Sequence, residues 1–299
     1  MKKSVSLLLA GLMLCGALAG CGGNNNTAEN TDSQTEQTSE STGTSGAIHV
    51  VSREDGSGTR GAFVELTGVE DDNGDNTTVD AEIANRTDAV LTTVAGNEAA
   101  IGYVSLGSLN DTVKAVTVDG VEATVDNVKS GTYTLSRPFN IATKGEPTGV
   151  AKDFINFILS ADGQAIVEEE NYIKVDDAAP AFTSDGSSGQ IAVGGSSSVS
   201  PVMEKLIEAY KAVNPNAQID LQTSDSTSGM TGAMDGTFAI GMASRELKDE
   251  EAAQLTGTAI ALDGIAVIVN TANTVENLTM DQIRSIYVGE TTDWADVAA

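Results

Sequence analysis

The feature of this sequence that most constrains its fold is a repeated order of short apolar run, small-residue loop and amphipathic segment. Apolar runs typical of short or buried strands occupy residues 48–51, 100–104, 191–193, 219–222 and 259–270. Helical periodicity occupies residues 148–159 and 201–213, with Ser200 as the expected N-cap of the second. Thr279-Met280-Asp281-Gln282 is a capping box that opens a further helix. Strands that alternate with helices predict an α/β fold with largely parallel pairing.

The first 47 residues differ in composition from the rest. Lys2 and Lys3 precede a short run rich in Leu, Ala and Gly, which predicts a secretory signal because a membrane span needs roughly 20 apolar residues. Leu18-Ala19-Gly20-Cys21 resembles the bacterial lipobox, whose Cys receives a diacylglycerol, although a chance Cys in an ordinary signal peptide is the alternative. Residues 22–46 are almost free of apolar side chains. We therefore expect a lipoprotein signal peptide at 1–20 and a lipidated Cys with a disordered tether at 21–47.

The charge and the metal-binding residue types exclude several classes of function. The formal net charge is −27, which argues against nucleic acid and against adhesion to anionic headgroups. It does not argue against a small anionic ligand, because surface charges are screened over roughly 8 Å at physiological salt. His49 is the only histidine and Cys21 would be the only cysteine of the mature chain, so we expect no metal site, no cofactor and no disulfide.

Three loops rich in small and hydroxyl-bearing residues each join a predicted strand to a predicted helix. They occupy residues 52–60 (SREDGSGTR), 194–201 (GGSSSVSP) and 223–229 (TSDSTSG). Free amides at a helix start favour an anion, and Arg53 adds a forked donor that Asp55 is placed to orient. One such loop is most often a plain connection. Three together predict a buried tetrahedral oxyanion held by hydroxyls, amides and one guanidinium.

These loops closely resemble those of the phosphate-binding proteins of phosphate-specific ABC transporters. Further segments that match are residues 92–109, 137–144, 154–163, 240–247 and 262–270, so the resemblance covers essentially all of 48–299. It implies a two-lobed, periplasmic-binding-protein-like fold of type II, with the ligand in the interlobe cleft. Residues 137–270 would form the lobe with the Gly-Ser-Ser and Asp-Ser-Thr loops, and residues 48–136 plus 271–299 the lobe with the Arg loop.

The order of the segments departs from that family, in which the Gly-Ser-Ser loop precedes the Arg loop. Residues 292–299 resemble the piece that normally leads into the strand at 48–51. We therefore expect a circular permutant, rejoined through residues 176–190, with the fold intact because permutation is tolerated when termini are close and exposed. A gene fragment, a fusion of two partial copies and a domain-swapped dimer are the alternatives.

The resemblance also implies which residues bind the ligand. Carried over position by position, the contacts are Arg53, Ser57, Gly58, Thr59, Ser197, Ser198, Ser226 and Ser244. Asp55 and Arg245 are implied supports. Ser244 stands where some members have an Asp that accepts the proton of monohydrogen phosphate, and Ala239 stands where an Asp is common. Asp225 is the candidate substitute acceptor.

The function implied is an extracytoplasmic binding lipoprotein that captures inorganic phosphate and delivers it to an ABC importer. Its expected partners are phosphate, the permease subunits and the membrane, which it would meet through a lipid anchor on the outer face. The alternatives are a binding protein for sulfate or molybdate, and a phosphate-sensing lipoprotein without a transport role. An enzyme is not expected, because His49 has no evident partner as a general base and no Walker-type lysine loop is present.

Overall fold

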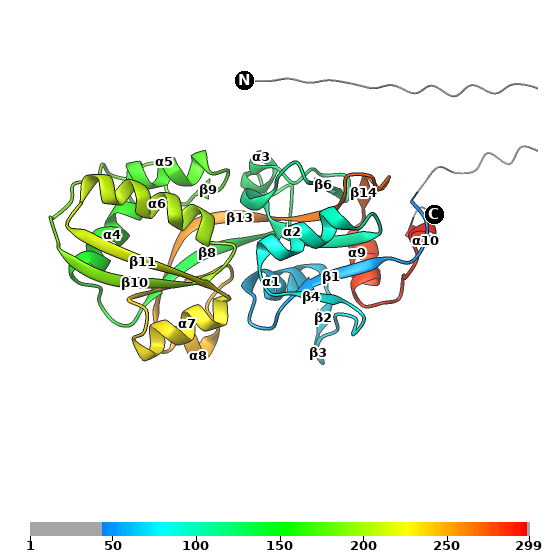
Figure 1. Ribbon diagram of the computed structural model, residues 1–299, viewed down its shortest axis with the longest axis horizontal. Coiled ribbons are helices and arrows are strands. Elements are labelled where there is room, and N and C mark those ends of the chain that lie inside the picture. The colour runs from blue at the N-terminus through cyan, green and yellow to red at the C-terminus, as the bar shows by residue number, and fades with distance from the viewer. Residues whose placement is uncertain (1–43, 298–299) are drawn as a thin grey trace, which may run out of the picture. The chain divides into compact units, whose positions relative to one another are not determined.

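The computed structural model describes residues 44–297, and these form an α/β body (Figure 1). The predicted signal peptide, Cys21 and nearly all of the predicted tether lie outside the described residues. Within 44–297, no helix combines the length and the apolar character that a membrane crossing requires. The predicted α/β class is confirmed.

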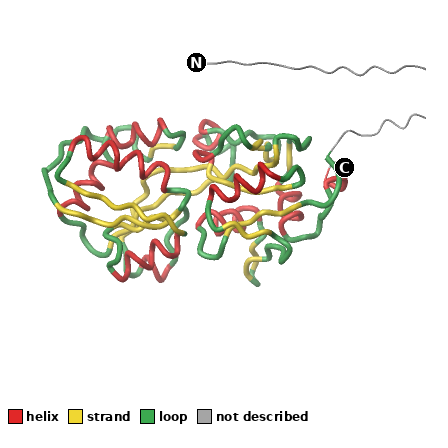
Figure 2. Tube along the Cα trace, in the orientation of Figure 1, coloured by secondary structure: helices red, strands yellow, loops and turns green. Residues whose placement is uncertain are grey.

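The main sheet contains ten strands in the part of the chain that the structure describes, and Figure 2 shows them running through the whole body. Its order is β11 (Ala217–Ser224), β10 (Gly189–Ser196), β12 (Ile240–Ala243), β8 (Ser136–Thr143), β13 (Thr256–Asn270), β5 (Ala100–Ser105), β1 (His49–Arg53) and β4 (Glu82–Ala84). β6 (Val113–Ala115) and β9 (Ile173–Lys174) also pair with β13. The strands at either end pair in parallel, as predicted, whereas β8 and β13 run antiparallel to their neighbours.

The long strand β13 takes part in two separate hydrophobic cores. Its first part, through Gly264, pairs with β8, and its last part, from Ile265, pairs with β5. Ile260 packs in a core around Phe154 and Leu206, whereas Val267 packs in a second core around Phe63. β8 and β13 are therefore the strands that connect the two halves (Figure 1). The division into lobes at 48–136 plus 271–299 and at 137–270 stays a prediction.

Helices cover both faces of each half of the sheet. In one half, α4 (Gly149–Ile158), α5 (Ala161–Glu169) and α6 (Ser200–Val213) lie on one face of β10 and β11, and α7 (Ser226–Asp235) lies on the other (Figure 1). In the other half, α2 (Thr87–Gly96) packs on β5 opposite α1 (Gly58–Thr67) and α9 (Met280–Tyr287). The remaining elements are β2 (Glu70–Asp71), β3 (Gly74–Asp75), η1 (Leu106–Ser108), β7 (Thr117–Val118), α3 (Val125–Lys129), α8 (Asp249–Ala252), β14 (Asn277–Leu278) and α10 (Trp294–Val297).

Local sequence explains where these helices begin. The capping box predicted at Thr279 is present, since Thr279 and Gln282 each accept a hydrogen bond from the other's backbone amide. α6 starts one residue earlier than predicted: Val199 is its N-cap, and Ser200 donates its hydroxyl to the carbonyl of Ser196. Such a shift is within the ordinary uncertainty of a helix end.

The first and last described segments lie side by side. The amide of Ile48 donates to the carbonyl of Thr292 across 2.8 Å, and the amide of Trp294 donates to the carbonyl of Gly46 across 3.0 Å. Residues 292–294 therefore lie directly beside the entry to β1. This proximity is what a permuted order requires, and the permutation itself stays a prediction.

Candidate functional site

Four helices begin at one place in the body. They are α1, α2, α6 and α7, each of ten residues or more, and each follows a strand of the main sheet. Free amides and the positive end of the helix dipole make every such start favourable for an anion. Four starts that converge from both halves of the molecule therefore create an unusually favourable place for negative charge.

A buried set of hydroxyls joins these helix starts, and we call it the hydroxyl cluster. Its members are Thr59, Thr87, Ser196, Ser197, Ser198, Ser226 and Ser244. The hydroxyls of Thr59 and Ser198 lie 2.8 Å apart, and those of Thr87 and Ser198 lie 3.2 Å apart. Each of these hydrogen bonds connects one half of the molecule to the other. Five of the predicted contact residues are thus brought together.

Arg53 reaches the hydroxyl cluster from the end of β1. Its side chain is almost fully buried, and its guanidinium donates to the hydroxyls of Ser197 at 3.1 Å and Thr87 at 3.3 Å. Its other donors form a bidentate pair with Glu54, at 2.8 Å from both Nε and Nη2. A buried guanidinium needs such an anionic partner, because an isolated charge in the interior is costly.

The prediction that Asp55 orients Arg53 is wrong. The Asp55 carboxylate is 99% exposed and pairs with Arg60 at 3.0 Å. Glu54 takes the predicted role, because its side chain, 18% exposed, lies beside the guanidinium while Asp55 points to solvent. Asp55 and Gly56 form a turn, closed by the amide of Ser57 donating to the carbonyl of Glu54, so the chain changes direction directly after Glu54.

Gly58 allows the first turn of α1 to approach the opposite half closely. A Cβ at this position would lie 2.4 Å from the Ser226 hydroxyl oxygen and 2.8 Å from that of Ser244. Both are shorter than a carbon can approach an oxygen. Gly58 therefore packs against the hydroxyl cluster, and its lack of a side chain is a requirement of this packing.

Ser226 and Ser244 form the part of the cluster beside Gly58. The Ser226 hydroxyl accepts from the amide of Ser244 at 3.1 Å, and the Ser196 hydroxyl donates to that of Ser244 at 3.0 Å. Ser244 is fully buried. The position that carries an acidic residue in some members of the resembled family thus holds a hydroxyl in contact with other hydroxyls.

Two other predicted residues serve their own segments. Ser57 is the N-cap of α1 and accepts from the amide of Arg60. Asp225 is the N-cap of α7, where its carboxylate accepts from the amide and the hydroxyl of Ser228. The suggestion that Asp225 replaces the missing acceptor is therefore not supported by its geometry, since its oxygens are committed to the helix start.

Arg245, a predicted support, lies outside the cluster and contacts the first turn of α7. It forms a bidentate pair with Glu251, at 2.7 and 2.9 Å, and donates to the hydroxyl of Thr227 at 3.2 Å. Thr227 in turn donates its amide to the carbonyl of Gly56 at 3.1 Å. Arg245 thus fixes the start of α7 against the Arg53 loop.

Sequence reasoning missed Thr87, Ser196 and Arg137. Thr87 opens α2 after a short strand, the same arrangement as in the three recognised loops, but its loop lacks their Gly and Ser content. Arg137 lies near the start of the mostly buried strand β8, and Asp263 interrupts the apolar run of β13. A lone carboxylate inside an apolar strand is a signal for a buried ion pair that the sequence does contain.

That ion pair lies directly behind the hydroxyl cluster. Arg137 Nη1 and an Asp263 carboxylate oxygen lie 2.9 Å apart, with both side chains almost completely buried. Burial, the largest influence, raises the pKa of Asp263 to about 6, while the charge of Arg137 and the Ser105 hydroxyl act in the opposite direction. Burial also lowers the pKa of Arg137, which the charge of Asp263 opposes.

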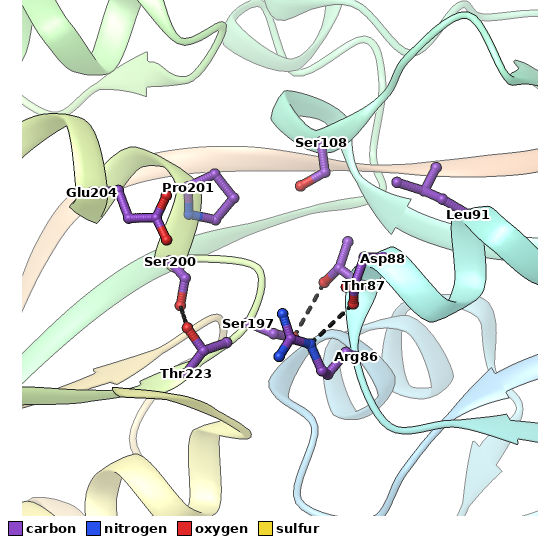
Figure 3. A pocket seen from close by; sticks show the side chains of 10 residues that line it. All are labelled: Arg86, Thr87, Asp88, Leu91, Ser108, Ser197, Ser200, Pro201, Glu204 and Thr223. Carbon is purple, nitrogen blue, oxygen red and sulfur yellow. Dashed lines mark hydrogen bonds and ion pairs between the residues drawn. The ribbon is translucent and has the colours of Figure 1, made fainter. Parts of the chain in front are cut away.

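A pocket of about 280 Å³ opens beside the cluster, between α2 and the start of α6 (Figure 3). Thr87 and Ser197 line it and also belong to the cluster. On one side Ser200 and Thr223 hydrogen-bond at 2.9 Å, and on the other Arg86 pairs with Asp88 at 3.0 Å. The pocket therefore gives the hydroxyl cluster an approach from solvent.

Comparisons with known proteins identify relatives over the whole chain. Residues 17–162 and 180–299 match the model of the PBP superfamily domain. The phosphate-binding protein PstS 2 of Streptococcus agalactiae serotype V is 48% identical over 304 residues, which cover 99% of this chain and 98% of the relative. The protein of the same name from Streptococcus pneumoniae serotype 4 is 44% identical over 297 residues, covering 98% of each.

A solved structure also resembles the body. The phosphate-binding protein of a phosphate ABC transporter from Streptococcus pneumoniae is 46% identical, with a TM-score of 0.69, and the match covers 84% of this chain and all of that chain. Together with the superfamily match, this confirms the predicted periplasmic-binding-protein-like fold.

Proposed function

The chain belongs to the PstS family of phosphate-binding proteins, within the PBP superfamily, and we propose that it captures inorganic phosphate for an ABC importer. The relatives of similar length are named as phosphate-binding proteins, and the similar solved structure belongs to a phosphate ABC transporter. The observation that carries the proposal is the meeting of Arg53 with the hydroxyl cluster at four helix starts.

The ligand would lie among Arg53, Gly58, Thr59, Ser197, Ser198, Ser226 and Ser244, with Thr87 as an added donor. These groups hydrogen-bond to one another across the two halves. Phosphate would replace those bonds with charge-assisted ones, which are roughly twice as strong as neutral ones. Ser57 would contribute through its position at the start of α1 rather than through its hydroxyl, which caps the helix.

The halves contribute donors from different sides, so binding would hold them together. The Arg53 loop and Thr87 belong to one predicted lobe, and Ser197, Ser198 and Ser226 belong to the other. Hinge closure around a ligand is the usual motion of such proteins. The closed form would offer a permease a surface different from that of the open form.

Phosphate selectivity would depend on hydroxyls rather than on a carboxylate. A serine or threonine hydroxyl can accept a hydrogen bond as well as donate one, so Ser244 could accept a hydrogen bond from the hydroxyl of monohydrogen phosphate. Sulfate would lack that proton but would still find donors. A sulfate or molybdate binding protein is thus the second candidate, and the names of the relatives favour phosphate.

The protein would act at the membrane surface as a binding protein and not as an enzyme. The resemblance of Leu18–Cys21 to a lipobox supports a lipid anchor at Cys21 on the extracytoplasmic face. A phosphate-sensing role without transport would use the same site.

Calorimetric titration of the purified protein, stripped of endogenous phosphate, tests the proposal. We expect binding of phosphate and of arsenate, which has the same charge states and shape, with sulfate and molybdate binding at least about 100-fold more weakly, a difference of about 2.7 kcal/mol. Tighter binding of sulfate or molybdate would establish the second candidate instead. No binding of any of the four anions would refute the oxyanion site.

A further inference from the structure

We propose that Arg137, held by Asp263, is a positioning residue of the oxyanion site: it makes the hydroxyl of Thr59 an obligatory donor toward the ligand. This inference rests on the proposed function, because it assigns a role within the same site. Arg137 contacts the cluster from behind and not through the ligand position itself.

The guanidinium of Arg137 is held on all sides. Nη2 donates to the Thr59 hydroxyl at 3.0 Å, Nε donates to the carbonyl of Ser244 at 3.1 Å, and Nη1 donates to the carbonyl of Gly264 at 3.3 Å. Nη1 also pairs with Asp263 at 2.9 Å. With 3% of the residue exposed, the planar group has one orientation that satisfies all four partners.

The bond to Thr59 fixes the direction of that hydroxyl. A guanidinium can only donate, so the Thr59 oxygen must accept from Arg137, and the single proton of the hydroxyl is left to point elsewhere. The neighbouring oxygens are those of Ser198 at 2.8 Å and Ser244 at 3.4 Å, on the side where the four helix starts meet. An anion at that place needs hydrogen-bond donors. Because the Thr59 oxygen accepts from Arg137, its proton can be donated to the anion.

The same guanidinium joins groups from both halves. Thr59 lies in the first turn of α1, and Ser244 follows β12. Both contact the guanidinium of Arg137, which belongs to β8. The bond to its carbonyl fixes the backbone of Ser244, whose amide donates to Ser226. Arg137 thus sets the spacing of three cluster residues without touching the ligand.

Asp263 keeps this guanidinium in place. Its carboxylate is completely buried, and within residues 44–297 its oxygens have no hydrogen bond of good geometry besides the ion pair. A buried ion pair is weak as a source of stability, because desolvation offsets the attraction. The Arg137–Asp263 pair lies directly beside the proposed ligand site. We therefore explain it by the orientation that it gives to the site residues and not by a contribution to the stability of the fold.

A double-mutant cycle in phosphate affinity tests the proposal, with Arg137→Gln, Thr59→Val and their combination measured by calorimetry. We expect Arg137→Gln to weaken phosphate binding roughly tenfold or more, as loss of an oriented donor to an anion does. In the Thr59→Val background the same change should weaken binding less than about threefold, because no hydroxyl remains to orient. Thr59→Ser, which keeps the hydroxyl, should restore the full effect.

Arg137→Lys is the companion variant in case the glutamine variant does not fold. Lys keeps the charge opposite Asp263 but is a point donor that cannot replace the fork, so it should also lose affinity, and again only when position 59 carries a hydroxyl. Equal losses in the threonine and valine backgrounds, or no loss, would overturn the role of Arg137 while leaving phosphate binding by the wild type intact. Failure of the wild type to bind phosphate would instead reject the proposed function.

Discussion

Arg53 Nη2 lies 3.1 Å from the hydroxyl of Ser197, although 144 positions of the sequence separate the two residues. Arg53 ends β1 in one half of the body, and Ser197 follows β10 in the other. The bond uses a buried cation and a hydroxyl that the proposed ligand would also use. The bond therefore joins the two halves of the body at the position proposed for the ligand.

Removal of the Arg53 side chain should weaken phosphate binding strongly. Truncating one partner of a buried charge pair costs about 2–5 kcal/mol, so Arg53→Ala should weaken phosphate binding by roughly thirtyfold or more in calorimetry. Lys205→Ala is the matched control, since it removes an exposed positive charge from α6. If both variants lost the same affinity, net charge and not contact would explain the loss.

Thr87 should be needed although sequence patterns did not reveal it. Thr87→Val keeps the shape and removes a hydroxyl that contacts Arg53, Ser197 and Ser198. We expect phosphate affinity to fall about tenfold, the value of a hydrogen bond to a charged group. Thr92→Val, at an exposed position of the same helix, should bind like the wild type. An unchanged affinity in Thr87→Val would exclude this residue from the site.

A methyl group at Gly58 should prevent the close approach of the two halves. The added Cβ would lie 2.4 Å from the Ser226 oxygen, so Gly58→Ala should lose phosphate affinity by at least about tenfold, with little loss of thermal stability. Gly61→Ala lies in the same helix, where the nearest atom to the new Cβ is 4.0 Å away, and should bind normally. Equal affinity of the two variants would mean that the halves need not approach as closely as they do here.

Much of the architecture could be predicted because it depends on local patterns. The apolar runs gave β1, β5, β10, β11 and β13, and the capping box at Thr279 gave the start of α9. The loops after β10 and β11 were predictable as neighbours, since parallel strands present their following loops at one edge of a sheet. The Arg53 loop follows β1 in the other half, where β1 runs opposite to β10, so the contact of Thr59 with Ser198 depends on how the two halves face each other.

The choice between neighbouring residues could not be predicted. Glu54 and Asp55 are adjacent acids, and only the local direction of the chain decides which of them faces Arg53. The Asp225 carboxylate could have faced the cluster or the start of its own helix. It accepts a hydrogen bond from the amide of Ser228 and so faces its own helix. Arg137 depends on a strand pairing between β8 and β13 that is distant in sequence, so its place behind Thr59 needs the tertiary structure.

Asp153 should make the free energy of unfolding decrease at acidic pH. It accepts hydrogen bonds from the Ser184 hydroxyl at 2.7 Å, the Asp185 amide at 3.0 Å and the Tyr210 hydroxyl at 2.8 Å. Burial is the largest single influence and raises its pKa, but these hydrogen bonds with that of Asn214 outweigh burial and lower the pKa below 3.8. The carboxylate therefore stabilises the fold above the pKa of the unfolded chain, and this contribution is lost as pH falls through the folded pKa.

Chemical unfolding of Asp153→Ala at two pH values tests this. At pH 7 we expect a loss of about 2–3 kcal/mol in the free energy of unfolding, as for hydrogen bonds to a charged group. As the pH falls through the folded pKa of Asp153, the difference from the wild type should shrink. Asp176→Ala, at an exposed position, should change stability by less than about 0.5 kcal/mol at either pH. A loss independent of pH would show that packing and not charge is responsible.

The predicted permutation can be tested by reversing it. The amide of Ile48 bonds to Thr292, so a linker of about four residues from the end of the chain to residue 47 should join them without strain. New termini can be opened at Gly186, an exposed residue with a φ of 73°, in the segment between β9 and β10. Neither change alters the residues of the Arg53 loop or of the loop that contains Ser197. The rearranged protein should therefore fold and bind phosphate within about threefold of the natural order, because the same contacts define the site. Failure of the rearranged chain to fold, with the linker lengthened as a control, would show that the natural order is needed for this fold and would count against a permutation of an intact ancestor.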